Sequence, residues 1–78
     1  MDELKSMRTE IDELDLQLME LLNRRYQLSK TIGIYKKQNQ KQVLDLKREH
    51  QILDKARDYS EEIYHVFFKI IEESKKLQ

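Results

Sequence analysis

The sequence contains no cysteine, no proline and no tryptophan, and only one glycine among its 78 residues. Without cysteine there is no disulfide scaffold, no thiolate metal site and no cysteine nucleophile. A single glycine excludes a glycine-rich phosphate-binding loop. Apolar runs reach only three or four residues, too short for a membrane span or a secretory signal, so we expect a cytoplasmic protein. Turn-forming residues are scarce among many Leu, Glu, Lys and Gln, which predicts helix nearly throughout.

The charges balance in total but are separated along the chain. Fifteen Lys and Arg against fifteen Asp and Glu give a net charge of zero, which argues against a general nucleic-acid binder. Residues 1–22 carry a local charge of −5, whereas residues 23–50 carry +6. A basic middle segment in a neutral protein fits either a compact anionic ligand or the acidic first third of a second copy of the chain.

Apolar residues in the first half follow a heptad, which predicts one long helix over about residues 2–40. Gly33 lies within this helix and weakens it by only about 1 kcal/mol relative to Ala. At 1.5 Å per residue such a helix is roughly 60 Å long, whereas a compact domain of this size is about 30 Å across. Its apolar face therefore needs a second chain, and we expect a homodimer. The heptad consists of Leu4, Met7, Ile11, Leu14, Leu18, Leu21, Leu28, Ile32 and Tyr35.

Two shorter helices complete the predicted all-α fold of a single domain, residues 1–78. Asp45 is a good N-cap for a second helix over about residues 45–57. A break with capping residues follows, and then an amphipathic third helix over about residues 60–77. The inward-facing residues of the second helix are Ile52, Leu53 and Ala56. The apolar stripe of the third helix consists of Ile63, Val66, Phe67, Ile70 and Ile71.

Arg25 interrupts the heptad between Leu21 and Leu28. A buried and unpaired guanidinium loses several kcal/mol of solvation, so Arg25 needs an anionic partner. One candidate is an acid of a second chain, such as Asp15 or Glu20. The other is an anion bound in a pocket, since guanidinium matches carboxylate and phosphate.

Further cations lie on the long helix. Lys36 follows Arg25 by three helical turns on nearly the same face. Arg8 lies toward the other end, where an antiparallel partner would bring it near the middle or far half of the second chain. Taken in isolation, Lys36 and Arg8 are typical of solvated flanking charges.

Polar residues also interrupt the shorter helices. Ser74 and Gln78 continue the apolar face of the third helix and offer a hydroxyl and an amide to a ligand, or else belong to a fraying end. The first turn of the second helix carries Asp45, Arg48 and Glu49 on one side. Those three residues fit either a ligand site or a helix cap with a surface ion pair.

The sequence contains no convincing motif for metal binding or for covalent catalysis. Glu62 and His65 have the Glu-x-x-His spacing of di-iron bundles, but they flank the apolar face and lack matching inward glutamates. His50 has no convincing partner, and no Ser–His–Asp arrangement is present. We therefore expect no metal and no cofactor.

Together these residues resemble the all-helical (AroQ-type) chorismate mutase family over roughly residues 4–78. The family usually has proline where this chain has Gln42. The matching positions of the first helix are Met7-Arg8, Ile11-Asp12, Leu14-Asp15, Leu21-Leu22, Arg25, Leu28, Ile32-Gly33 and Lys36. Those of the rest of the chain are Val43-x-Asp45, Arg48-Glu49, and Ile70-Ile71-x-x-Ser74 with Gln78.

The resemblance implies an intertwined homodimer in which the long helix of each chain completes the other chain's active site. It also implies an isomerase that rearranges chorismate to prephenate on the shikimate route to phenylalanine and tyrosine. By the family's pattern, Arg25 and Arg8 of the other chain hold the carboxylates of chorismate. The implied catalytic residues are Lys36, Gln78, Arg25 and Glu49. The implied substrate-binding residues are Arg8, Arg25, Lys36, Asp45, Arg48, Glu49, Ser74 and Gln78.

The chemistry suits these residue types. The rearrangement is unimolecular and needs no proton transfer, so oriented reacting atoms and fixed donors suffice to lower the barrier. By the resemblance, Lys36 and Gln78 bond the ether oxygen and Glu49 holds the ring hydroxyl. Two alternatives stay open: an isochorismate pyruvate lyase on the same scaffold, and a non-catalytic helical dimerisation or regulatory module.

Overall fold

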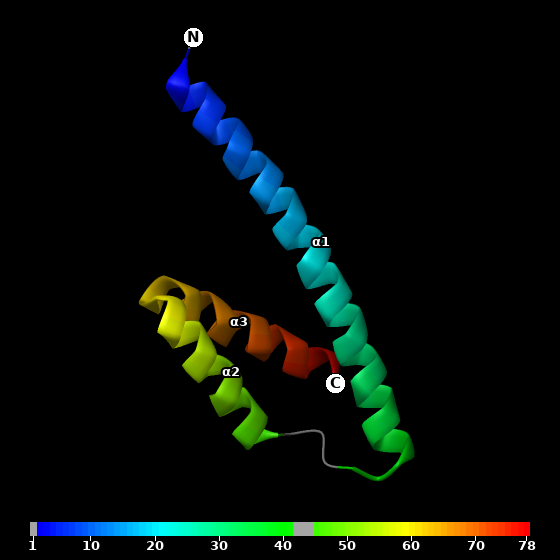
Figure 1. Cartoon of the computed structure of the whole chain (residues 1–78). Coiled ribbons are helices and arrows are strands. Elements are labelled where there is room, and N and C mark those ends of the chain that lie inside the picture. The colour runs from blue at the N-terminus through cyan, green and yellow to red at the C-terminus, as the bar shows by residue number, and fades with distance from the viewer. Residues whose placement is uncertain (1, 42–44) are drawn as a thin grey trace.

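The computed structural model describes residues 2–41 and 45–78, and Gln42 and Val43 lie outside the described residues. Every secondary-structure element in the described residues is an α-helix (Figure 1). This confirms the all-α class, with a long, a short and a medium helix. No helix in the described ranges is both long and apolar enough to cross a membrane. The helices are α1, Glu3–Gln38, α2, Leu46–Tyr59, and α3, Glu61–Leu77.

A polar side chain caps the start of each helix. The Oδ1 atom of Asp2 accepts a hydrogen bond from the backbone N–H of Leu4 at 3.0 Å, at the start of α1. Asp45 caps α2 in the same way, as its sequence context predicts. Ser60 caps α3 and also ends α2, so a single extended residue reverses the chain. These caps satisfy backbone donors that a helix start otherwise leaves without a partner.

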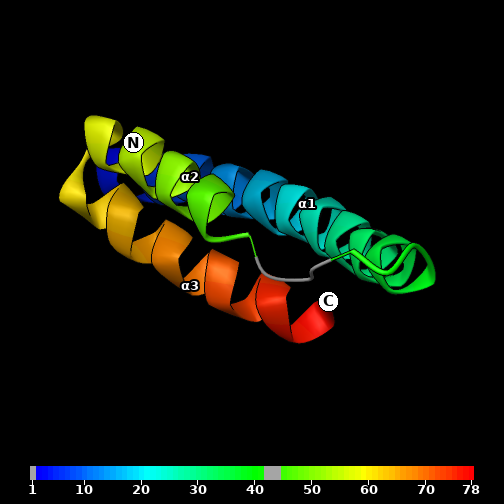
Figure 2. The ribbon, with the colours of Figure 1, turned by 90° about the horizontal axis from the view of Figure 1, so that it is seen from below.

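The helices form an elongated molecule rather than a compact bundle. α2 and α3 run antiparallel and lie side by side (Figure 2). The C-terminal half of α3 also packs against α1, whereas the N-terminal half of α1 extends past the α2–α3 pair (Figure 1). The molecule measures 59 × 24 × 14 Å. The long dimension matches the rod length expected from the heptad.

Small residues on α1 allow α3 to approach closely. Ser29 and Gly33 are one helical turn apart, and both are buried. A Cβ atom added to Gly33 would lie 2.7 Å from the Cα atom of Gln78, far inside van der Waals contact. The single glycine of the chain therefore stands where the backbone at the end of α3 crosses α1.

The apolar core of one chain is small, and most of the heptad face remains exposed. Only Ala56, Ile70 and Ile71 are buried apolar residues among those the structure describes. The nine heptad residues keep 41% to 63% of their surface exposed. Ile63 and Val66, which belong to the apolar stripe of α3, are exposed as well. The physical reason is that α3 packs on α2 and only its end packs on α1, which leaves most of the heptad face and part of α3 uncovered in one chain.

Candidate active site

Seven of the eight predicted substrate-binding residues line one pocket of about 350 Å³ where the three helices meet. This volume falls in the range of small-molecule sites. Ile32 and Ile71 form part of its apolar wall. The seven polar residues are Arg25 and Lys36 from α1, Asp45, Arg48 and Glu49 from the start of α2, and Ser74 and Gln78 from the end of α3.

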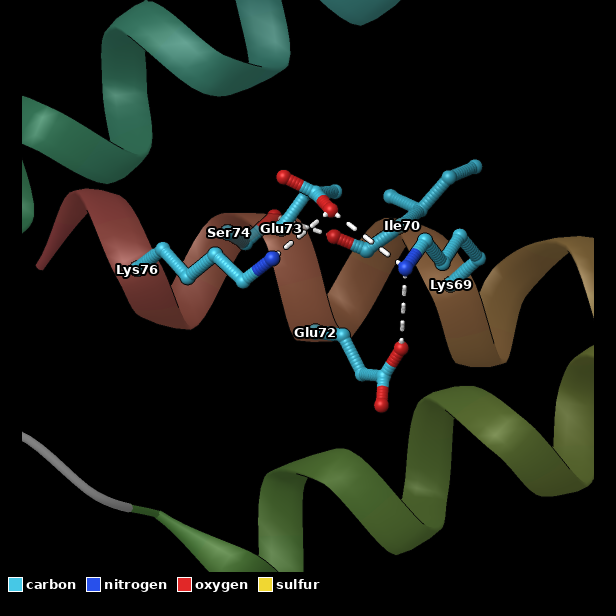
Figure 3. A network of polar contacts seen from close by, with 6 residues as sticks. All are labelled: Lys69, Ile70, Glu72, Glu73, Ser74 and Lys76. Atoms are coloured by element: carbon cyan, nitrogen blue, oxygen red, sulfur yellow. Dashed lines mark hydrogen bonds and ion pairs between the residues drawn. The ribbon is translucent and has the colours of Figure 1, made fainter.

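Arg25 is held in the pocket by a serine instead of an acid. Its Nη1 atom donates a hydrogen bond to Oγ of Ser74. The Ser74 hydroxyl donates in turn to the backbone carbonyl of Ile70 at 2.8 Å (Figure 3). Within the described residues Arg25 makes no ion pair, so its positive charge is available to a ligand or to a second chain.

Burial lowers the pKa of the Arg25 guanidinium below its ordinary value; Tyr26 opposes this change, and the nearby charge of Arg48 lowers the pKa further. Arginine nevertheless stays cationic at neutral pH, because its pKa lies far above 7. A partly buried guanidinium that lies near a second cation is stabilised when an anion binds beside it. This electrostatic arrangement favours an anionic ligand.

The first turn of α2 contributes two carboxylates with different tasks. Asp45 accepts a hydrogen bond from the backbone N–H of Arg48 at 3.1 Å and is fixed as the helix cap. Glu49 does not pair with Arg48; its Oε1 atom lies 2.8 Å from Nζ of Lys75 on α3. The cap is therefore as predicted, whereas the ion pair joins two helices instead of lying within one.

Sequence reasoning missed Lys75 as a pocket residue. It follows the predicted Ser74 directly, and one helical step places it toward α2. The periodicity of α3 contains no signal for this contact, because the partner Glu49 belongs to another helix. Only the packing angle of α2 and α3 brings the two side chains together.

Gln78 and Lys36 approach the pocket from different helices near Gly33. Gln78 is the C-cap of α3, and its backbone N–H donates to the carbonyl of Lys75 at 3.2 Å. Lys36 lies three residues beyond Gly33 and therefore on the same face of α1. The contact between Gln78 and Gly33 thus places an amide and an ammonium at neighbouring positions of one pocket.

Arg8 is the one predicted substrate-binding residue that the single chain does not bring to this site. It lies on the exposed N-terminal part of α1. A separation of seventeen residues from Arg25 corresponds to about 25 Å along the helix. A contribution from Arg8 therefore requires a second chain.

The pocket carries a net positive charge inside apolar walls. Four cations and two carboxylates line it, a net charge of +2, beside the apolar side chains Leu28, Ile32, Ile52 and Ile71. The described residues contain no group of three His, Asp or Glu side chains that could hold a metal ion. These features define an all-helical domain with a positively charged, partly apolar pocket of small-molecule size.

Comparison with known proteins identifies the family. Residues 7–78 match the family described as chorismate mutase type II. A bifunctional chorismate mutase/prephenate dehydratase from Aquifex aeolicus (strain VF5) is 38% identical over 64 residues, which cover 82% of this chain and 18% of that relative. No solved structure gives a significant match. The chain belongs to the type II chorismate mutase family, which confirms the resemblance of its motifs, and it spans less than a fifth of the length of this relative.

Proposed function

We propose that this chain is a chorismate mutase that converts chorismate to prephenate in aromatic amino-acid biosynthesis. The observation that carries the proposal is one pocket in which seven of the predicted polar residues meet from three helices, and whose whole lining, Lys75 included, has a net charge of +2. Chorismate is a dicarboxylate with an enol ether and a ring hydroxyl. Its charge, its apolar ring and its hydroxyl each have a counterpart among the lining residues.

The reaction breaks the C–O bond of the ether while a C–C bond forms within the same molecule. No proton, nucleophile or second substrate takes part. The pocket favours the folded conformer in which the reacting carbons approach. Lys36 and Gln78 donate hydrogen bonds to the ether oxygen, which gains negative charge as its bond breaks. A fixed donor of this kind lowers a barrier by roughly 3–4 kcal/mol.

The remaining residues bind and orient the substrate. Arg25 takes one carboxylate, and Ser74 acts through Arg25, since its hydroxyl already holds that guanidinium. Glu49 accepts a hydrogen bond from the ring hydroxyl beside the backbone at Asp45. Arg48 organises the site by its charge.

A second copy of the chain completes each site in this proposal. The acidic N-terminal half of α1 covers the α2–α3 pair of its partner and brings Arg8 to the second carboxylate. Two observations support a dimer. The heptad face is exposed in one chain, and an apolar groove of about 280 Å³ remains open between α2 and α3. The groove is lined by Ile52, Lys55, Ala56, Tyr59, Ile63 and Phe67.

The test is the fall in ultraviolet absorbance of chorismate with purified protein, followed by acid conversion of prephenate to phenylpyruvate. We expect loss of chorismate with prephenate as the product. The variant Arg25→Ala, confirmed as a folded dimer by sedimentation, is the negative control. It separates turnover at this pocket from the slow uncatalysed rearrangement.

Parallel assays with isochorismate distinguish the closest alternative chemistry. Release of pyruvate from isochorismate, without prephenate from chorismate, would assign the pocket to a lyase. A folded dimer that is inert toward both substrates would refute an enzymatic role and point to a dimerisation or regulatory module.

A further inference from the structure

The ion pair between Lys75 and Glu49 differs from the other ion pairs of the described chain. It joins α3 to α2 across the pocket at 2.8 Å, and the Glu49 side chain is only 18% exposed. The others join residues three or four apart in sequence and lie on the surface. Surface pairs of that kind contribute little to stability. The Lys75–Glu49 pair thus orders two long side chains at the wall of the site.

Glu49 presents an electrostatic problem for a pocket that binds a dianion. A carboxylate in a partly buried site repels the carboxylates of the ligand more strongly than it would in water. The ammonium of Lys75 compensates this charge at Oε1. A carboxylate has a second oxygen, so Oε2 can still accept a hydrogen bond from a hydroxyl.

We propose that Lys75 is a positioning residue that holds Glu49 in place and neutralises it, so that this carboxylate can accept the hydroxyl of a dianionic substrate without repelling it. Lys75 itself need not touch the reacting atoms. The inference rests on the proposed function of the pocket. It predicts that loss of Lys75 weakens substrate binding chiefly by acting through Glu49.

The neighbouring lysine provides a matched control. Lys76 pairs with Glu73 at 3.1 Å on the outer side of α3 (Figure 3) and does not line the pocket. Lys75→Met and Lys76→Met therefore remove the same charge and one ion pair each from adjacent positions. Lys75→Arg keeps the cation, and Glu49→Gln removes the group through which Lys75 acts.

The experiment measures kcat and KM for chorismate in these variants and in the double variant Glu49→Gln/Lys75→Met. For Lys75→Met we expect a rise in KM of about 10-fold with kcat changed by less than about 3-fold, because binding in the ground state and the transition state is weakened alike. Lys76→Met should match the native chain, and Lys75→Arg should recover most of the loss. In the Glu49→Gln background, Lys75→Met should change KM by less than about 2-fold.

The outcomes separate this inference from the proposed function. An inactive native chain refutes the proposed function, and the inference with it. In an active enzyme, equal kinetics for Lys75→Met and Lys76→Met overturn the inference alone. The same follows if Lys75→Met is as harmful in the Glu49→Gln background, since Lys75 would then not act through Glu49. A role in folding alone would lower thermal stability and leave KM unchanged.

Discussion

Replacement of the single glycine by alanine separates the stability of α1 from the geometry of the site. In Gly33→Ala the new Cβ would lie 2.7 Å from Cα of Gln78 and 2.9 Å from its carbonyl oxygen. Carbon atoms in contact are about 3.5 Å apart or more, so the backbone of Gln78 must move by about 0.8 Å. Gln78 is the C-cap of α3, where the chain moves more easily than inside a helix.

We expect Gly33→Ala to stabilise helix α1 and to lower the catalytic activity of the site. Alanine is better than glycine inside a helix by about 1 kcal/mol, so thermal stability should stay the same or rise slightly. A catalytic group misplaced by about 1 Å costs up to roughly 100-fold in rate. If Gln78 donates to the ether oxygen as proposed, kcat should fall by roughly 10- to 100-fold. The amide is needed mainly in the transition state, so KM should change much less.

The assay combines chorismate turnover with thermal unfolding of Gly33→Ala, Gln78→Ala and the double variant. Thr31→Ala is the control, since Thr31 is exposed on α1 and its replacement also favours the helix. Once the Gln78 amide is removed, Gly33→Ala should change kcat by less than about 2-fold. A folded Gly33→Ala with native kcat would refute the proposed positioning of Gln78. The proposed positioning would also be refuted if Gly33→Ala lowered kcat equally in the native chain and in the Gln78→Ala variant.

Three further predictions concern the charge and the assembly of the site. Arg25→Met should lower kcat/KM by roughly 100-fold or more. It should leave thermal stability unchanged or raised, because burial disfavours the charged form of Arg25 and lowers its pKa. Mixing Arg8→Ala with Arg25→Ala should restore about one quarter of native activity after subunit exchange, since half of the dimers then hold one intact site. Leu14→Lys on the exposed heptad face should shift the chain toward monomer in sedimentation and abolish activity.

Each of these predictions has a contrary result. A large loss of stability in Arg25→Met would indicate a structural ion pair with an acid of the second chain. No recovery after confirmed subunit exchange would exclude a site shared between two chains. A native chain that sediments as an active monomer would contradict the proposed dimer.

Near neutral pH, the titration of Arg25 should contribute little to the pH dependence of the free energy of unfolding. Its pKa is lowered in the folded chain, so protonation opposes folding, and this penalty is relieved only as pH rises through the lowered pKa. Unfolding measured between about pH 6 and 9 should therefore give the same stability difference between the native chain and Arg25→Met. A difference that changes steeply within this range would show that another group titrates with Arg25.

Local patterns were sufficient for the helices, whereas most of the candidate site residues came from the resemblance to a family. Asp45 and Ser60 cap helices through hydrogen bonds to residues three positions away, which a sequence displays directly. Arg25 stood out because a charge interrupts an apolar heptad. The position of Arg8 outside the pocket of its own chain also follows from the length of one continuous helix.

The sequence by itself thus determined three helices, an apolar face too long for one chain to cover, and a family whose polar motif residues are spread over all three helices. Only the tertiary structure decided how those residues meet. Ser74 accepts a hydrogen bond from Arg25, Lys75 forms an ion pair with Glu49, and the backbone of Gln78 packs against Gly33. Each of these contacts joins two helices, so it depends on the angle and depth at which α3 crosses its neighbours. Helix formation is governed by bonds between residues a few positions apart, and no such local rule sets that crossing.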